Sequence, residues 1–162
     1  MTASGKQQTA KGGDSRSLRA THDPFAGVYT FRGLAVWQRA QELAASVYGL
    51  VRPLPNDRAT SVVVQQLLRS STSIAANIAE GHGRYSAGAY RNHLSIARGS
   101  TTETMSWIDL LKRTELITPA QEAELLETCA ELMKMLSAKM IDLDRQTRPK
   151  RALREDAVER EV

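Results

Sequence analysis

A chain of 162 residues that are 41% hydrophobic can form one domain with a substantial core, and it is too short for two typical domains. No apolar run approaches the roughly 18 residues of a membrane span, the single Cys129 leaves no internal disulfide, and the first thirty residues lack the apolar segment of a secretory signal. We therefore expect a cytoplasmic protein without membrane association, and the net charge of +4 alone does not indicate a basic domain.

The N-terminal part of the chain is predicted to contain an arm and one helix. Residues 1–30 are rich in Gly, Ser, Thr and Lys without periodicity, which is typical of a disordered arm. From Leu34 to Arg52, apolar residues recur at spacings of three and four, which predicts an amphipathic helix. The prolines of Pro53-Leu54-Pro55 end it.

A second helix is predicted from Asn56 or Asp57, either of which can supply the N-cap oxygen, to about Ala79. Its opening Val62-Val63-Val64 would also suit a strand, but the later apolar residues follow a helical period. One face of this helix is crowded with small residues that let a neighbouring helix approach closely: Ser70, Ser71, Thr72, Ser73, Ala75 and Ala76.

Two further helices complete the pattern. The third runs from a cap at Ser86 to about Lys112, and the fourth opens with Thr118-Pro119-Ala120-Gln121, which has the spacing of a capping box. Short links between long helices favour antiparallel neighbours. We therefore predict an all-α, antiparallel up-and-down four-helix bundle over residues 31–147, followed by a charged tail over 148–162.

The third predicted helix carries two apolar stripes, which is more than a closed bundle requires. One stripe contains Leu94, Ala97, Thr101, Ile108 and Leu111. The second contains Ile96, Trp107 and Leu110 and is predicted to be an interface with another subunit. The alternative is a single subunit whose third helix lies deep in the bundle.

The stretch Ser73–Arg84, SIAANIAEGHGR, is the most unusual in the chain. It lacks the last glycine of a dinucleotide-binding G-x-G-x-x-G and no strand precedes it, which argues against a phosphate site. Gly81 fits a left-handed residue just after a helix end. We interpret the stretch as a structural corner between two helices, formed by Asn77, Glu80, Gly81, Gly83 and Arg84.

Metal binding and covalent catalysis are the alternatives for this stretch. Glu80, His82 and His93 are possible ligands, but no His pair or Glu-x-x-His pair has helical spacing. A Cys–His nucleophile pair is not excluded, although Cys129 falls in an apolar stripe, where a free cysteine usually packs in the core. We expect no metal, no cofactor, no catalytic residue and no enzymatic activity.

Several motifs occur here in the order found in one known family. They are LAVWQRA (Leu34–Ala40), Leu54-Pro55, Gln66 with Arg69, SIAANIAEGHGR, YRNHLSIARGS (Tyr90–Ser100) and Glu103. Over Phe31 to Asp144 the chain resembles the four-helix-bundle proteins encoded in intervening sequences of bacterial 23S ribosomal RNA genes. That family is similar in turn to the accessory protein of diversity-generating retroelements, a pentameric ring whose basic surface binds nucleic acid and a reverse transcriptase. The resemblance implies a homopentameric ring without known enzymatic activity.

The charges suggest how such an oligomer would act. Residues 58–113 hold seven basic and three acidic side chains, whereas 115–131 hold five glutamates and no basic residue. This split predicts either a basic and an acidic surface or the solvated faces of separate helices. We predict phosphate contacts, in RNA or DNA, from Arg58, Arg69, Arg84, Arg91, Arg98, Lys112 and Arg113. The alternative is a scaffold whose charged tails recruit a protein partner.

Overall fold

The protein is described here by a computed structural model that covers residues 30–147. The predicted arm and tail lie outside these residues. A short 3₁₀ helix, η1 (Thr30–Gly33), precedes the four α-helices α1 (Ala35–Val51), α2 (Arg58–His82), α3 (Ala87–Arg113) and α4 (Pro119–Thr147). This part of the chain contains no strand, so Val62-Val63-Val64 is helical. Within residues 30–147, no helix is long and apolar enough to cross a membrane.

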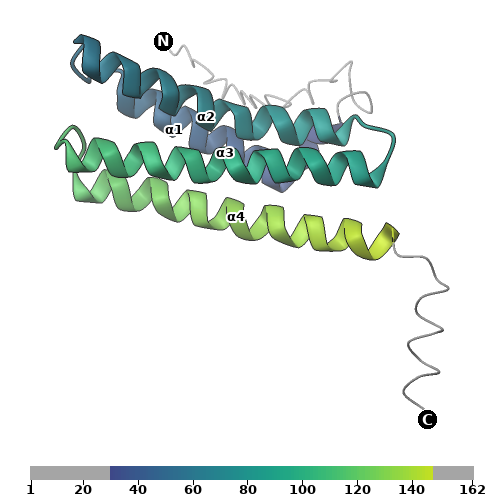
Figure 1. Ribbon diagram of the computed structural model, residues 1–162. Coiled ribbons are helices and arrows are strands. Elements are labelled where there is room, and N and C mark those ends of the chain that lie inside the picture. Colours follow the sequence, from purple (N-terminus) through teal and green to yellow (C-terminus); the bar gives the residue numbers. More distant parts are fainter. Residues whose placement is uncertain (1–29, 148–162) are drawn as a thin grey trace, which may run out of the picture.

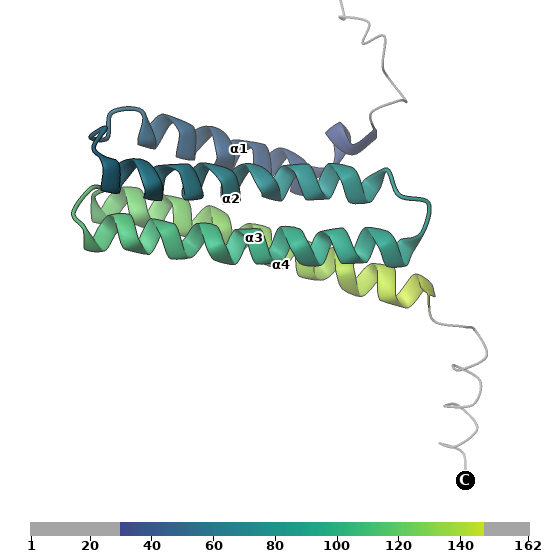
Figure 2. The same ribbon diagram turned by 45° about the horizontal axis from the view of Figure 1, so that its top comes forward.

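The four helices run antiparallel in chain order, as predicted (Figure 1). Each contacts its two neighbours around a square, and α4 closes the bundle against α1 (Figure 2). Because each link reverses the chain, α1 begins at the same end of the bundle as α2 ends, α3 begins and α4 ends. Assembly of this bundle into a ring remains a prediction.

The core follows the predicted helical stripes. Every helix contributes completely buried side chains, among them Leu43 of α1, Leu67 and Ile74 of α2, and Leu132 of α4. The first predicted stripe of α3 is buried along its length, including Thr101. Alternation of apolar residues at spacings of three and four therefore places one face of each helix inside the bundle.

Side-chain caps fix where three of the helices start. Asp57 accepts hydrogen bonds from the backbone amides of Ala59 and Thr60 at 2.9 and 3.1 Å, so Asp57 rather than Asn56 is the N-cap of α2. Ser86 accepts from the amide of Ala89 at 3.1 Å. Thr118 and Gln121 exchange reciprocal bonds at the start of α4 (Thr118 Oγ1 accepts from the Gln121 amide at 3.2 Å, and Gln121 Oε1 from the Thr118 amide at 2.8 Å). The capping residues therefore set these boundaries.

The prediction that Gly81 is a left-handed residue beyond the helix end is wrong. Helix α2 continues to His82, with Gly81 buried inside it, and Gly83 is the C-cap with φ −77°. A Cβ on Gly81 would lie 2.6 Å from Cβ of His93 and 2.9 Å from Cδ2 of Tyr90. Glycine is needed here because α3 passes very close to α2, not because the backbone turns.

One strained residue was not predicted. Glu115, in the link between α3 and α4, has φ 58°, the left-handed region that glycine normally occupies. The amide of Leu116 donates to the carbonyl of Leu111 at 2.9 Å, which closes the C-terminus of α3. The link therefore has the backbone conformation of a helix end that usually requires glycine, with a glutamate in the left-handed position.

Candidate nucleic-acid interface

The charges of the bundle are distributed by end rather than by face. One end, which we call the basic end, comprises residues 30–38, 76–98 and 136–147 and has six basic and three acidic side chains, leaving +3. The opposite end, which we call the acidic end, comprises residues 46–66 and 108–127 and has four basic and six acidic side chains, leaving −2. The middle third is neutral, with three of each. The antiparallel topology places the acidic start of α4 beside the end of α3, which separates charge along the bundle axis (Figure 1).

The seven predicted phosphate contacts do not form one surface. Arg84, Arg91 and Arg98 lie on the basic end and Arg69 in the middle, and all four are exposed. Arg58, Lys112 and Arg113 lie on the acidic end, where six acidic side chains outnumber the four basic ones.

Arg113 shows this compensation directly. Its Nε lies 2.6 Å from Oδ2 of Asp109. The hydrogen bond to Asp109, with the charges of Asp109 and Glu122, raises the pKa of the Arg113 guanidinium. The nearby carboxylates would repel a phosphate, so this end is the less favourable one for nucleic acid.

Of the three arginines predicted to contact phosphates at the basic end, two hold exposed ion pairs. Arg84 pairs with Glu80 one turn earlier, and Arg91 Nε lies 2.5 Å from Oδ1 of Asp144 in α4. The paired side chains are about half exposed, 50% and 52% for the first pair and 46% and 49% for the second. Such pairs are weak in water, so a phosphate can compete for either guanidinium.

Arg98 is turned the same way as Arg91. Seven residues make about two helical turns, so both lie on one stripe of α3, and the ion pair of Arg91 shows that this stripe borders α4. Arg98 makes no ion pair within residues 30–147. Its charge is therefore available to a ligand.

One of the predicted corner residues, Asn77, belongs to a polar seam between α2 and α3. The Asn77 side-chain amide donates to the carbonyl of Ser73 at 2.8 Å and to its hydroxyl at 3.0 Å. Ser73 also accepts from Ser100 Oγ at 3.1 Å. Nδ1 of His93 lies 3.4 Å from Oδ1 of Asn77. Asn77 therefore organises the helix pair from inside α2 and does not cap its end.

The sequence analysis missed one conspicuous residue of the basic end, Tyr85. Its relative exposure is 110%, so its ring contacts essentially nothing in the bundle. It lies between Arg84 and the cap residue Ser86 in the link from α2 to α3. The sequence did contain a signal of this exposure. An aromatic residue in a short glycine-containing link cannot belong to the buried apolar stripe of either neighbouring helix.

The predicted interface residues share one side of α3. Ile96 is 45% exposed, whereas Trp107 is half-buried against the core and its Nε1 lies 3.4 Å from Oε1 of Glu103. Leu110 borders a shallow apolar hollow of about 270 Å³ with residues of α2 and of the α3–α4 link, including Val63 and Leu116. The stripe is thus partly covered by α2, and its contact with another subunit remains a prediction.

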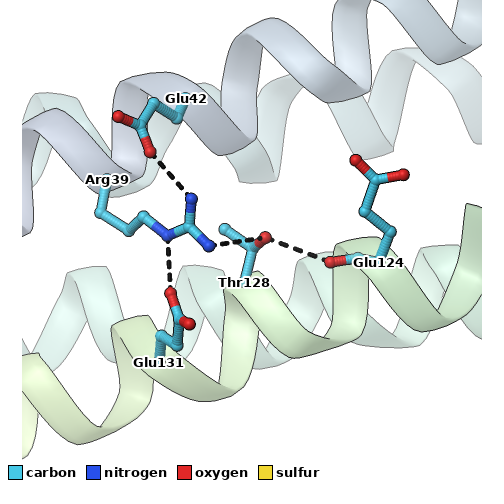
Figure 3. Close-up of polar contacts among 5 residues, drawn as sticks. All are labelled: Arg39, Glu42, Glu124, Thr128 and Glu131. Atoms are coloured by element: carbon cyan, nitrogen blue, oxygen red, sulfur yellow. Dashed lines mark hydrogen bonds and ion pairs between the residues drawn. The ribbon is translucent and has the colours of Figure 1, made fainter.

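Arg39 links α1 to α4 in the neutral middle of the bundle (Figure 3). Its guanidinium lies 2.8 Å from Oε2 of Glu42 on the same helix and 2.7 Å from Oε2 of Glu131 on α4. The hydrogen bonds to Glu42 and Glu131 raise its pKa. One cation thus faces two carboxylates, so no excess positive charge remains there for a phosphate.

Cys129 lies completely buried in the core, and burial raises the pKa of its thiol to about 12. Very little thiolate, the reactive form, is then present at neutral pH. Among the described residues, no three side chains of His, Cys, Asp or Glu are arranged to hold a metal ion. Cys129 therefore packs as a small apolar residue.

Comparisons with known proteins agree with this geometry. The family model described as 23S rRNA-intervening sequence protein matches residues 32–138. The chain is also similar to a crystal structure from Bacteroides thetaiotaomicron VPI-5482, a protein of unknown function from the S23 ribosomal protein family. It shares 35% identity with that protein over 65% of this chain and 97% of that one, with a TM-score of 0.61. No curated protein matches.

Proposed function

Because the chain belongs to the 23S rRNA-intervening sequence protein family, we propose that it is a non-enzymatic oligomer that binds nucleic acid, RNA or DNA, through basic side chains of α2, α3 and the link between them. The supporting observation is the net charge of +3 at the basic end, where Arg84, Arg91 and Arg98 are all exposed. Such side chains displace counterions from phosphates, which makes binding favourable and dependent on salt.

Oligomerisation is part of the proposal because one subunit presents few phosphate contacts. A homopentameric ring would repeat the same basic end five times, and repetition can strengthen binding by orders of magnitude without new contacts. The exposure of Ile96 on α3 and of Val62 on α2, 45% and 55%, supports a further subunit contact along this side.

A charge-reversal comparison tests the binding site. The triple variant Arg84→Glu, Arg91→Glu, Arg98→Glu reverses the candidates on the basic end, and Arg58→Glu, Lys112→Glu, Arg113→Glu is its matched control on the acidic end. In filter-binding titrations over a range of salt concentrations, the first variant should lose most of its affinity and show a shallower salt dependence. The control should retain most of both.

Two outcomes would refute this proposal. If the affinity of the wild type did not change with salt concentration, phosphate contacts would be ruled out as the basis of binding. Equal losses in the two triple variants would show that the difference in charge between the ends has no role in binding.

A protein-binding scaffold is the second candidate. The start of α1 and the end of α4 lie at the same end of the bundle, so residues 1–29 and 148–162 both connect to that end (Figure 2). Residues 1–29 hold six charged side chains and residues 148–162 hold nine, and the two segments could recruit one partner together. If deletion of both segments left every co-purifying protein in place, this function would be ruled out.

A further inference from the structure

Tyr85 is an aromatic side chain that the fold does not use. Burial of a tyrosine normally contributes substantially to stability because 150–250 Å² of ring surface leaves water, but Tyr85 is 110% exposed. A single exposed aromatic residue needs no explanation by itself. The position of Tyr85 does need an explanation, because this residue lies at the tip of the basic end, next in the chain to Arg84.

The ring shares the basic end with several cations that can bind phosphate. Arg84 precedes it, and Arg91 lies about one and a half turns into α3, roughly 7–8 Å along the helix axis from the cap at Ser86. Arg145, near the end of α4, is exposed and makes no ion pair in the part of the chain that the structure describes. An exposed ring among cations is the combination that binds unpaired nucleotides, in which a base stacks on the ring while the cations contact the backbone.

We infer that the basic end binds single-stranded nucleic acid, with Tyr85 stacking on an unpaired base and Arg84, Arg91 and Arg145 contacting the flanking phosphates. This inference rests on the proposed nucleic-acid binding and narrows its ligand to unpaired strands. Every base has a flat face, so stacking on one tyrosine selects for unpaired bases and not for a particular sequence. A duplex keeps its bases stacked inside and would engage only the arginines.

The variant Tyr85→Ala isolates this contribution, because a side chain without contacts can be removed without destabilising the bundle. Tyr85→Phe keeps the ring. Tyr48→Ala is the matched control, because Tyr48 is also exposed, at 60%, but lies near the end of α1 on the acidic end. Fluorescence anisotropy would measure binding of a labelled oligothymidylate of about twelve nucleotides, an abasic strand of the same length and a duplex.

We expect Tyr85→Ala to weaken oligothymidylate binding about 5- to 150-fold, the range that loss of one stacked base produces. Binding of the abasic strand and the duplex should not change. Tyr85→Phe and Tyr48→Ala should bind oligothymidylate as the wild type does.

Other outcomes separate the inference from the proposed function. If the wild type binds no nucleic acid, the proposed function fails and the inference with it. If the wild type binds but Tyr85→Ala binds oligothymidylate equally well, or loses the abasic strand to the same extent, the stacking inference fails and the general function stands. If polyglutamate displaces oligothymidylate at matched charge and its own binding depends on Tyr85, the site is for an acidic protein and the inference is overturned.

Discussion

Gly81 lies at a close approach of α2 and α3, and its replacement by alanine measures how far the fold depends on that approach. The new Cβ would lie 2.6 Å from Cβ of His93, whereas carbon atoms pack at about 3.5–4.0 Å. Because Cβ of His93 is bonded directly to the backbone, no rotamer change removes the clash, and the helices must separate by about 1 Å. Overpacking of this kind costs about 1–3 kcal/mol, and the higher helix propensity of alanine offsets up to about 1 kcal/mol.

We therefore expect Gly81→Ala to lower the free energy of unfolding by about 1–2 kcal/mol, which is a fall in Tm of roughly 5 °C for a bundle of this size. Gly99→Ala is the control, because Gly99 lies in α3 with no atom within 4 Å of an added Cβ, and it should gain up to about 1 kcal/mol. Thermal unfolding followed by far-UV circular dichroism, at one protein concentration, would compare them. A Gly81→Ala protein as stable as the Gly99→Ala protein would refute the reasoning.

Three further predictions concern single residues. Glu115→Gly should raise the free energy of unfolding by about 0.5–1 kcal/mol in urea titrations because it relieves the left-handed strain. Glu115→Ala keeps the strain and should not raise it. Equal gains in the two variants would show that removal of the negative charge, and not relief of strain, stabilises the protein. The hydrogen bonds from Thr60 and Ala59 lower the pKa of Asp57 below its usual 3.8, so its carboxylate stabilises the fold above that value and the stabilisation is lost as the pH falls through the lowered pKa. Asp57→Asn retains an N-cap oxygen without that titration, so melting curves from pH 5 to 2 should show a smaller loss of stability in the variant, and identical losses would contradict this role. Burial and the raised pKa of Cys129 predict that a thiol reagent labels it only after unfolding, and rapid labelling of the native protein would show that this part of the core is open.

The sequence was most informative where structure depends on local chemistry. The prolines after α1, the serine before α3 and the capping box of α4 each act on residues within one helical turn, so their effect can be predicted from spacing alone. Gly81 shows where this reasoning fails. A glycine near a helix end suits both a left-handed cap and a close helix contact, and only the positions of His93 and Tyr90, on another helix, distinguish the two.

For the candidate site, the sequence describes how charge is distributed along the chain and not in space. Residues 58–113 are rich in basic side chains, which left open either one basic surface or the solvated faces of separate helices. The chain reverses after α3, however, and brings Glu122 of α4 close enough to Arg113 for their charges to interact. Only the arginines at the opposite end remain in positive surroundings. Spacing along one helix cannot reveal such compensation, because it arises from pairing between helices.

The most direct test of this account is to map where nucleic acid contacts the bundle. Backbone amide signals of the protein would be compared with and without a short single-stranded oligonucleotide. The account predicts changes concentrated in residues 82–91 and 139–147, at the basic end. Changes concentrated in residues 52–58 and 112–124 at the acidic end, or no changes under low salt, would contradict it.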